Sequence, residues 1–156
     1  MTTAWLPKTD FSPFLRTDFT DDEAWQELLD ETGDDWVTVV TEPSHQDLSV
    51  HELMALVPEG SRYPVLVIAD RVTFSSAERS LLLIDVLDEP GRTFRVVPDA
   101  FQSVIGNLAI DNVTFGDYLN TLDASGVHRL EDRHYQALAE LQSHSQPNKP
   151  DSPSKS

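Results

Sequence analysis

Three acidic residues stand directly after segments that have the composition of buried strands. Asp18 follows FLRT, Glu42 follows WVTVVT, and Asp70 follows VLVIA. Open α/β sheets bind their ligands beyond the carboxyl ends of parallel strands, so we expect these side chains at one edge of a sheet. Asp21 and Asp22 lie just beyond the first of these strands. Because Mg²⁺ prefers carboxylate oxygens, Asp18 and Asp70 form a candidate metal pair.

Other features of the sequence favour a structural role for these carboxylates. The arrangement is similar to that of response-regulator receiver domains, but those proteins contact the phosphoryl group with a lysine after their last strand. Here the only lysines are at positions 8, 149 and 155. Asp21 and Asp22 also suit the first turn of a helix, where negative charge interacts favourably with the macrodipole. We therefore expect no bound metal, and the carboxylate pair remains the alternative.

The histidines form no known metal-binding or catalytic pattern. Neither H-x-H nor H-E-x-x-H occurs among the five histidines, which are His45, His51, His128, His134 and His144. His128 lies at the end of a predicted strand, where we expect an exposed or partly satisfied imidazole. No residue is assigned as catalytic. If the protein performs acid–base chemistry, the candidate catalytic residues are Asp18, Asp70 and His128, because Asp and His are common general acids and bases.

The stretch DEPGRTFRVVPDAFQSVIGNLAIDNVTF, residues 88–115, holds four more candidates for ligand binding. Arg92 ends a predicted turn, and Arg95 could clamp a carboxylate through two hydrogen bonds, on a ligand or within the protein. The internal pair is favoured because the chain has 27 acidic and 11 basic residues. Asn107 is expected to close the helix of this stretch, and Asn112 belongs to the turn before the next helix. The stretch is therefore predicted to be mainly structural, with a pocket between it and the sheet as the alternative.

The net charge limits which partners the chain can bind. Its acidic and basic residues give −16 at neutral pH over 156 residues, and residues 1–35 alone hold ten acids. A field of this sign repels nucleic acids and anionic membranes, and it favours basic proteins or cations. The predicted acidic face consists of Asp21, Asp22, Glu23, Asp30 and Glu31, continued by Asp34 and Asp35.

Missing residue types exclude several chemistries. The chain has no cysteine, which excludes disulfides, thiolate catalysis and cysteine-ligated metals. The lack of lysine between residues 9 and 148 excludes a P-loop lysine and a Schiff base in the core. G-x-G-x-x-G and G-x-S-x-G are absent as well, so we expect no cofactor, although a small-molecule ligand stays open. MTTAWLPKTD does not resemble a secretory signal and no apolar run could span a bilayer, which predicts a cytoplasmic protein.

The apolar pattern predicts a single three-layer α/β domain with a mostly parallel sheet. Strands are expected at 14–18, 36–42, 65–70, 81–87 and 93–97. Glu89-Pro90-Gly91-Arg92 fits a type II turn, which would join the last two strands into a hairpin at one edge of the sheet.

Helix starts are predicted from capping residues. Thr20 with Glu23 and Ser49 with Glu52 fit the capping box, and further helices are expected to begin at Pro98 and Thr114 and to cover 131–142. The expected organisation is an N-terminal arm over 1–13, a domain over 14–142 and a disordered polar tail over 143–156.

Several short motifs resemble those of one known family. PGRTFRVVP, then NL-x-I-x-N at 107–112, Phe115 and GVHR at 126–129 resemble a family of small actinobacterial proteins that is catalogued as a domain of unknown function. The likeness extends to LRTDFTDDEAW and LVIADR, and it covers most of residues 14–130. The resemblance implies no activity. Gly106 departs from the pattern, because relatives carry a second asparagine there, and the C-terminal extension is not shared.

These observations favour a non-catalytic acidic protein of the immunity or adaptor type that binds a basic partner. The alternative is a small cofactor-free pocket enzyme, such as a cyclase, isomerase or hydrolase, that uses Asp or His as acid and base. A third hypothesis is a ligand or Mg²⁺ sensor at the Asp18 and Asp70 edge.

Overall fold

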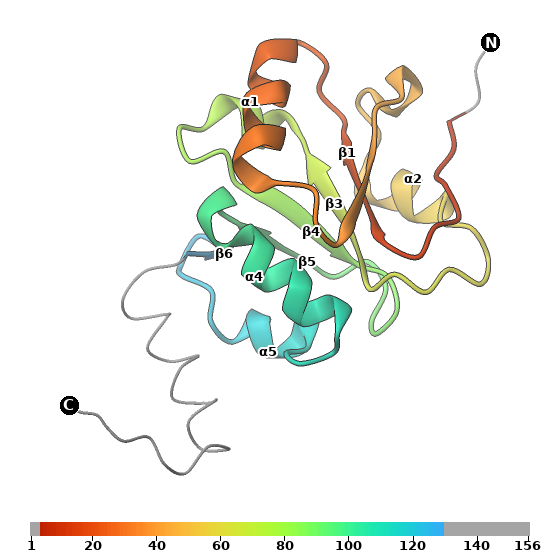
Figure 1. Cartoon of the computed structure of the whole chain (residues 1–156), viewed down its shortest axis with the longest axis vertical. Coiled ribbons are helices and arrows are strands. Elements are labelled where there is room, and N and C mark those ends of the chain that lie inside the picture. The colour runs from red at the N-terminus through yellow and green to blue at the C-terminus, as the bar shows by residue number, and fades with distance from the viewer. Residues whose placement is uncertain (1–3, 130–156) are drawn as a thin grey trace.

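A six-stranded mixed sheet forms the centre of the molecule, which a computed structural model describes over residues 4–129 (Figure 1). Its spatial order is β2-β1-β3-β4-β5-β6. β1 is parallel to β2 and β3, β5 is parallel to β6, and β4 is antiparallel to both neighbours. This confirms the predicted α/β class with a mostly parallel sheet. The strands are β1 (Ser12–Arg16), β2 (Val37–Val40), β3 (Val65–Ala69), β4 (Leu81–Asp85), β5 (Thr93–Val96) and β6 (Val127–His128).

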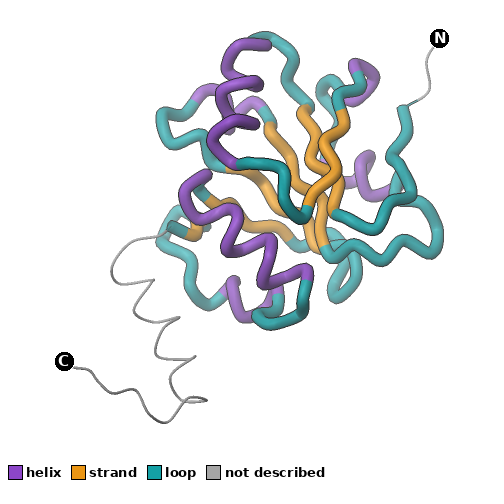
Figure 2. The backbone as a smooth tube through the Cα atoms, viewed as in Figure 1, coloured by secondary structure: helices purple, strands orange, loops and turns teal. Residues whose placement is uncertain are grey.

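Short helices connect most of the strands (Figure 2). The helix predicted over 131–142 and the tail predicted over 143–156 lie outside the described residues. The helices of the described part are α1 (Asp22–Thr32), the 3₁₀-helix η1 (Pro43–His45), α2 (Val50–Ala55), α3 (Arg71–Ser75), α4 (Pro98–Ala109) and α5 (Phe115–Leu119).

Capping residues set most helix starts as predicted. In the capping box of α2, the Glu52 N–H donates to Ser49 Oγ at 3.1 Å and the Ser49 N–H donates to Glu52 Oε1 at 2.9 Å. Thr114 caps α5 in the same way, and Pro98 is the first residue of α4. Such bonds satisfy amide groups that have no partner within the helix, which is why the sequence pattern locates these ends.

The predicted capping box at the start of α1 is wrong. Asp21, not Thr20, caps this helix by accepting a hydrogen bond from the Ala24 N–H at 3.0 Å. The Thr20 hydroxyl instead donates to Asp18 Oδ1 at 2.6 Å. A carboxylate accepts hydrogen bonds more strongly than a hydroxyl, so the helix begins one residue later than predicted.

The predicted hairpin is present between β4 and β5. Gly91 has φ +98°, and the Arg92 N–H donates to the Glu89 carbonyl at 3.2 Å, so the turn uses the freedom of its glycine. The short strand β6 pairs with β5 on the far side and forms the edge of the sheet, so the predicted position of the hairpin at an edge is wrong. The sequence predicted a strand end at His128, and this strand is β6, but a two-residue strand has no measurable period that would predict its pairing with β5.

Two apolar cores lie on opposite faces of the sheet. Val65 and Val67 of β3 belong to the core shared with α1 and α4. Leu66 and Ile68 belong to the second core, which α2 and the segment before β1 cover through residues such as Leu6. Because side chains alternate along a strand, covering both faces explains the uninterrupted apolar run of β3.

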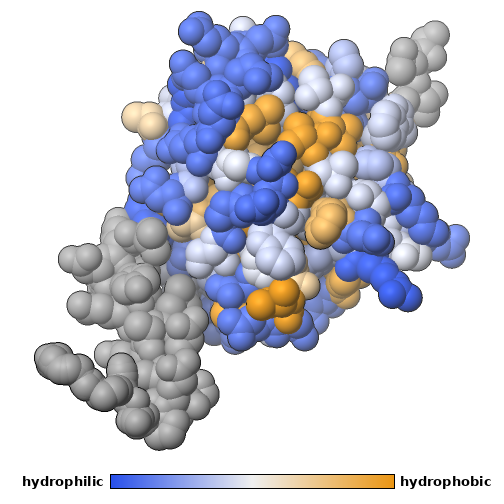
Figure 3. Space-filling view, in the orientation of Figure 1, coloured by the Kyte–Doolittle hydropathy of each residue, from blue (hydrophilic) through white to orange (hydrophobic). Residues whose placement is uncertain are grey.

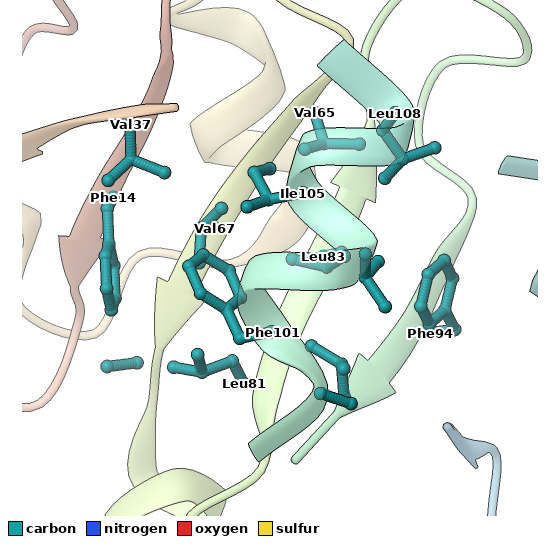
Figure 4. Close-up of a cluster of buried hydrophobic side chains, with 14 of the residues drawn as sticks. Phe14, Val37, Val65, Val67, Leu81, Leu83, Phe94, Phe101, Ile105 and Leu108 are labelled. Carbon is teal, nitrogen blue, oxygen red and sulfur yellow. The ribbon is translucent and has the colours of Figure 1, made fainter. Parts of the chain in front are cut away.

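The larger core is built between α4 and the strands. Figure 4 shows Phe101 and Ile105 of α4 directed toward the sheet, with Phe94, Phe14 and Leu83 around them. The rings of Phe14 and Phe101 lie 5.5 Å apart, centroid to centroid. This packing places the C-terminal end of α4 over the start of β3, where a cavity forms.

Substitution of Phe101 tests the importance of this core. Phe101→Ala is expected to lower the free energy of unfolding by about 3–5 kcal/mol, because it leaves a cavity under α4. Val39→Ala, at an exposed position on β2, should cost less than about 1 kcal/mol. Chemical denaturation measures both values, and equal losses would show that α4 does not anchor the core.

Candidate functional site

Asp18 and Asp70 lie at the same edge of the sheet. β1 and β3 are parallel with Arg16 opposite Ala69, and the Thr17 N–H donates to the Ala69 carbonyl at 3.0 Å. The two carboxylates therefore follow neighbouring strands at their carboxyl ends, which is the geometry that the strand pattern predicts.

The carboxylate of Asp18 is occupied by its own loop. Asp18 Oδ1 accepts hydrogen bonds from the Thr20 N–H at 2.9 Å and from the Thr20 hydroxyl at 2.6 Å. The bond from the Thr20 hydroxyl is the main reason that the pKa of Asp18 lies below its ordinary value, and the charges of Arg71 and Arg16 add to it. Asp18 therefore stabilises the turn that leads into α1.

Asp70 has two structural roles. It caps α3 by accepting from the Thr73 N–H at 3.1 Å, and it forms an ion pair with Arg95. The two guanidinium contacts to Asp70 measure 3.1 Å and 2.6 Å, and Arg95 also donates to the Ser80 carbonyl at 3.2 Å. Arg95 thus makes the internal carboxylate clamp that the sequence favours, and its proposed contact with a ligand stays a prediction.

The structure gives no support to a metal site at this edge. Among residues 4–129, no group of three or more His, Cys, Asp or Glu side chains is placed to hold a metal ion. Glu42, after β2, instead accepts a hydrogen bond from the Ser44 hydroxyl at 2.9 Å at the start of η1. The alternative metal pair, Asp18 and Asp70, therefore remains without a third ligand in the described part of the chain.

His128 is buried, so the expectation of an exposed or partly satisfied imidazole is wrong on exposure. Its Nδ1 lies 2.9 Å from the Thr121 hydroxyl oxygen, and that hydroxyl donates to the Tyr118 carbonyl at 2.8 Å. The His128 ring also meets the Tyr118 ring edge-on at 5.2 Å. Burial arises because α5 and the following turn cover β6, which the sequence did not reveal. A catalytic role for His128 stays a prediction.

Two asparagines connect α4 to α5. Asn107 does not close its helix, since α4 continues to Ala109 and Asp111 is the residue with φ +58°. Asn107 donates to the Tyr118 hydroxyl at 3.0 Å, and Asn112 donates to Asn107 Oδ1 at 3.1 Å. Burial raises the pKa of the Tyr118 phenol above its ordinary value. The asparagines therefore fix the position of α5 through side-chain bonds.

Arg92 organises the turn between β4 and β5. It donates to Asp85 Oδ2 at 2.9 Å and to Asp88 Oδ2 at 3.2 Å, and it lies 3.4 Å from Glu89 Oε2. Its guanidinium also stands 5.2 Å from the centre of the Phe115 ring. The hydrogen bonds to Asp85 are the main reason that the pKa of Arg92 is raised above its ordinary value.

A cavity of about 410 Å³ lies where β3 begins, β4 ends and α4 meets α5. This is the pocket between the 88–115 stretch and the sheet that the sequence left as an alternative. Its wall combines apolar side chains with three carboxylates and one guanidinium. The lining residues are Arg62, Pro64, Val65, Asp85, Leu87, Asp88, Leu108, Ala109, Asp111, Val113, Thr114 and Phe115.

The exposed side of α1 carries the predicted acidic face. Figure 3 shows hydrophilic side chains gathered over this helix, at the upper left of the view. Asp21 is the helix cap, and Asp22 forms an ion pair with Arg16 at 2.9 Å. Within the described residues, Glu23, Asp30 and Glu31 form no salt bridge.

A comparison with known families identifies the group to which the chain is related. The family model described as "Domain of unknown function (DUF6924)" matches residues 11–131. The chain belongs to this family. The match spans β1 through β6, so the DUF6924 domain contains the acidic helix, the carboxylate edge and the cavity together. A search of curated proteins finds no match. The predicted resemblance to a family of unknown function is confirmed, and the actinobacterial origin and the specific motif stay predictions.

Arg16 is the main residue that the sequence analysis missed. Its side chain is only 2% exposed, and its Nε donates to the Asp18 carbonyl at 3.0 Å. The guanidinium lies 4.5 Å from the centre of the Phe19 ring and 5.3 Å from that of Trp25. The sequence feature that could have identified Arg16 is a lone arginine at the end of an apolar strand, shortly before the acidic pair Asp21 and Asp22.

Removal of the Thr20 hydroxyl tests the state of Asp18. Thr20→Val is expected to raise the pKa of Asp18 toward its ordinary value, because it removes the principal hydrogen bond to the carboxylate. A lowered folded-state pKa stabilises the protein above the unfolded value of about 3.9, and this stabilisation is lost as the pH falls through the folded-state value. At neutral pH, wild type should therefore melt at a higher temperature than Thr20→Val. In acid, the two melting temperatures should converge.

Carboxyl ¹³C NMR titration measures this pKa directly. Thr41→Val, which removes an exposed hydroxyl elsewhere, is the matched control and should leave the pKa of Asp18 unchanged. An unchanged pKa of Asp18 in Thr20→Val would contradict the conclusion that the Thr20 hydroxyl is the main cause of the lowered pKa.

Proposed function

We propose that this protein is a non-catalytic acidic interaction protein, of the immunity or adaptor type, and that it binds a basic partner protein through α1. The observation that supports this function is the charge of the helix. α1 carries Asp22, Glu23, Glu27, Asp30 and Glu31 and has no basic residue. Carboxylates on one exposed face steer a basic protein into an encounter and suppress the binding of acidic ones.

The acidic residues at the C-terminal end of α1 are unfavourable for the helix alone. The C-terminal end of a helix carries partial negative charge, so acids there are destabilising. Asp30 and Glu31 lie in the last turns of α1, and Asp34 and Asp35 follow immediately after Gly33. Helix stability by itself does not explain acidic residues at this end of α1. A basic partner would offset their repulsion.

Exposed apolar residues beside the acidic face could add affinity. Trp36 is 40% exposed and Val39, on the edge strand β2, is 38% exposed. Trp36 packs against Gly106. A Cβ atom added at position 106 would lie 3.0 Å from the indole nitrogen, so an asparagine there would displace the Trp36 ring. Large aromatic side chains are common anchors of protein interfaces, and charges around them set the orientation of the partner.

The alternative function, a small cofactor-free enzyme, is favoured only by the cavity. A general base needs a carboxylate that can approach the substrate proton. Asp85, the buried carboxylate of the cavity wall, is engaged by Arg92 in an ion pair. We therefore rank this function second.

The proposed site of action is the cytoplasm. The absence of cysteine fits a reducing compartment, where disulfides do not contribute to stability. Along residues 4–129, none of the helices combines the length and apolar character needed to cross a bilayer. The same acidic field that favours a basic protein disfavours nucleic acid and anionic membrane as partners.

Affinity capture from the native cell extract tests this function. The protein should retain a stoichiometric basic protein at about 0.05 M salt and lose it at about 0.5 M, because salt screens the charges. The triple variant Glu23→Gln, Asp30→Asn, Glu31→Gln should retain about tenfold less, since each exposed charge contributes only a fraction of a kcal/mol to about 1 kcal/mol.

A second triple variant controls for net charge. Asp10→Asn, Asp47→Asn and Glu59→Gln change the total charge equally at exposed positions outside α1, and they should leave capture unchanged. Equal losses in the two variants would exclude α1 as the docking face. Recovery of the protein without any basic partner would exclude the function.

A further inference from the structure

The cavity beside the β4–β5 turn has the size and wall of a small-molecule site. Its volume of about 410 Å³ falls in the range of ligand pockets. Val65, Leu108 and Phe115 are buried core residues that supply an apolar part of the wall, and Val113 adds a half-buried one. Such a surface favours an apolar ligand body of limited size, because its burial removes apolar area from water.

The polar part of the wall contains a carboxylate with unused capacity. Asp85 is 2% exposed, and its Oδ2 accepts hydrogen bonds from the Glu89 N–H and from Arg92. Its Oδ1 accepts only one hydrogen bond from the described residues, which the Asp88 N–H donates at 3.2 Å. A carboxylate oxygen has two lone pairs, so this buried group can accept one more donor.

The charge balance of the wall selects a cation. Among the described residues that line the cavity, Asp85, Asp88 and Asp111 are acidic and Arg62 is the one basic residue. Arg92 lies nearby, but it is shared among Asp85 and two further acids. The cavity also faces the C-terminal end of α4, where the helix has partial negative charge, within a protein of net charge −16.

We propose that this cavity binds a small organic amine, with the ammonium group at the carboxylates and the apolar body against Phe115, Leu108 and Val113. The ammonium has three donors, which matches an acceptor-rich wall. This site does not share residues with α1, so it is independent of the proposed docking face and adds a ligand to the protein's function.

Titration with two matched probes tests the site. Phenethylamine and 3-phenylpropionate have similar apolar bodies and opposite charge, and amide NMR spectra report where each binds. Phenethylamine should give saturable shifts centred on Ala109, Asp111, Val113 and Phe115, and it should bind at least about tenfold more tightly than the anion. Equal affinity of the probes, or amine-induced shifts centred on α1, would overturn the proposal.

Two variants and their controls localise the binding. Asp111→Asn should weaken phenethylamine about threefold to fivefold, and asparagine suits the φ of +58° at this position. Ala109→Trp should abolish binding, because Ala109 is an exposed residue of the cavity wall whose enlargement fills the space. Asp47→Asn, at an exposed residue with a similar φ of +63°, and Ala124→Trp make the same changes outside the cavity and should bind as wild type. Wild-type affinity in both cavity variants would overturn the proposal.

Discussion

The fold depends on covering β3 on both of its faces. Each of its five residues is buried, and alternate side chains enter separate cores. Such a strand is stable only if elements pack on both sides of the sheet, because each exposed apolar side chain would lose about 1.5–3 kcal/mol of burial free energy. α1 and α4 therefore occupy one face, and α2 with the N-terminal segment occupies the other. The positions of the acidic helix and of the cavity follow from this arrangement.

Ionic and hydrogen-bonding groups at the carboxyl edge of the sheet serve the fold. Arg16 is buried among aromatic rings and pairs with Asp22, while Arg95 pairs with Asp70. A buried guanidinium without such partners would be strongly destabilising, so these contacts are a condition of placing arginine there. The edge where open α/β sheets commonly bind ligands is thus taken up by the protein's own side chains. This favours a function located on α1 and in the cavity near the opposite end of β3.

Much of the fold could be predicted from the sequence because its signals are local. Apolar runs identified the longer strands, Pro90-Gly91 identified the hairpin turn, and Ser49 with Glu52 identified the start of α2. For β6, the sequence predicted only a strand end at His128 and not its place in the sheet, because its two residues become a strand through pairing with β5. The start of α1 was misplaced by one residue because two neighbouring acceptors compete for the same amide groups.

The sequence by itself determined the charge of the protein, its lack of cysteine, and the acidic composition of α1. These are properties of residue types and of neighbours along the chain. Only the tertiary structure decided which partner each polar side chain takes, since Arg95 meets Asp70 across 25 positions and Asn107 reaches Tyr118 from another helix. It also decided that Asp85, Asp111 and Phe115 share one cavity. Contacts between distant segments depend on how the two cores close around the sheet, and no local pattern encodes that geometry.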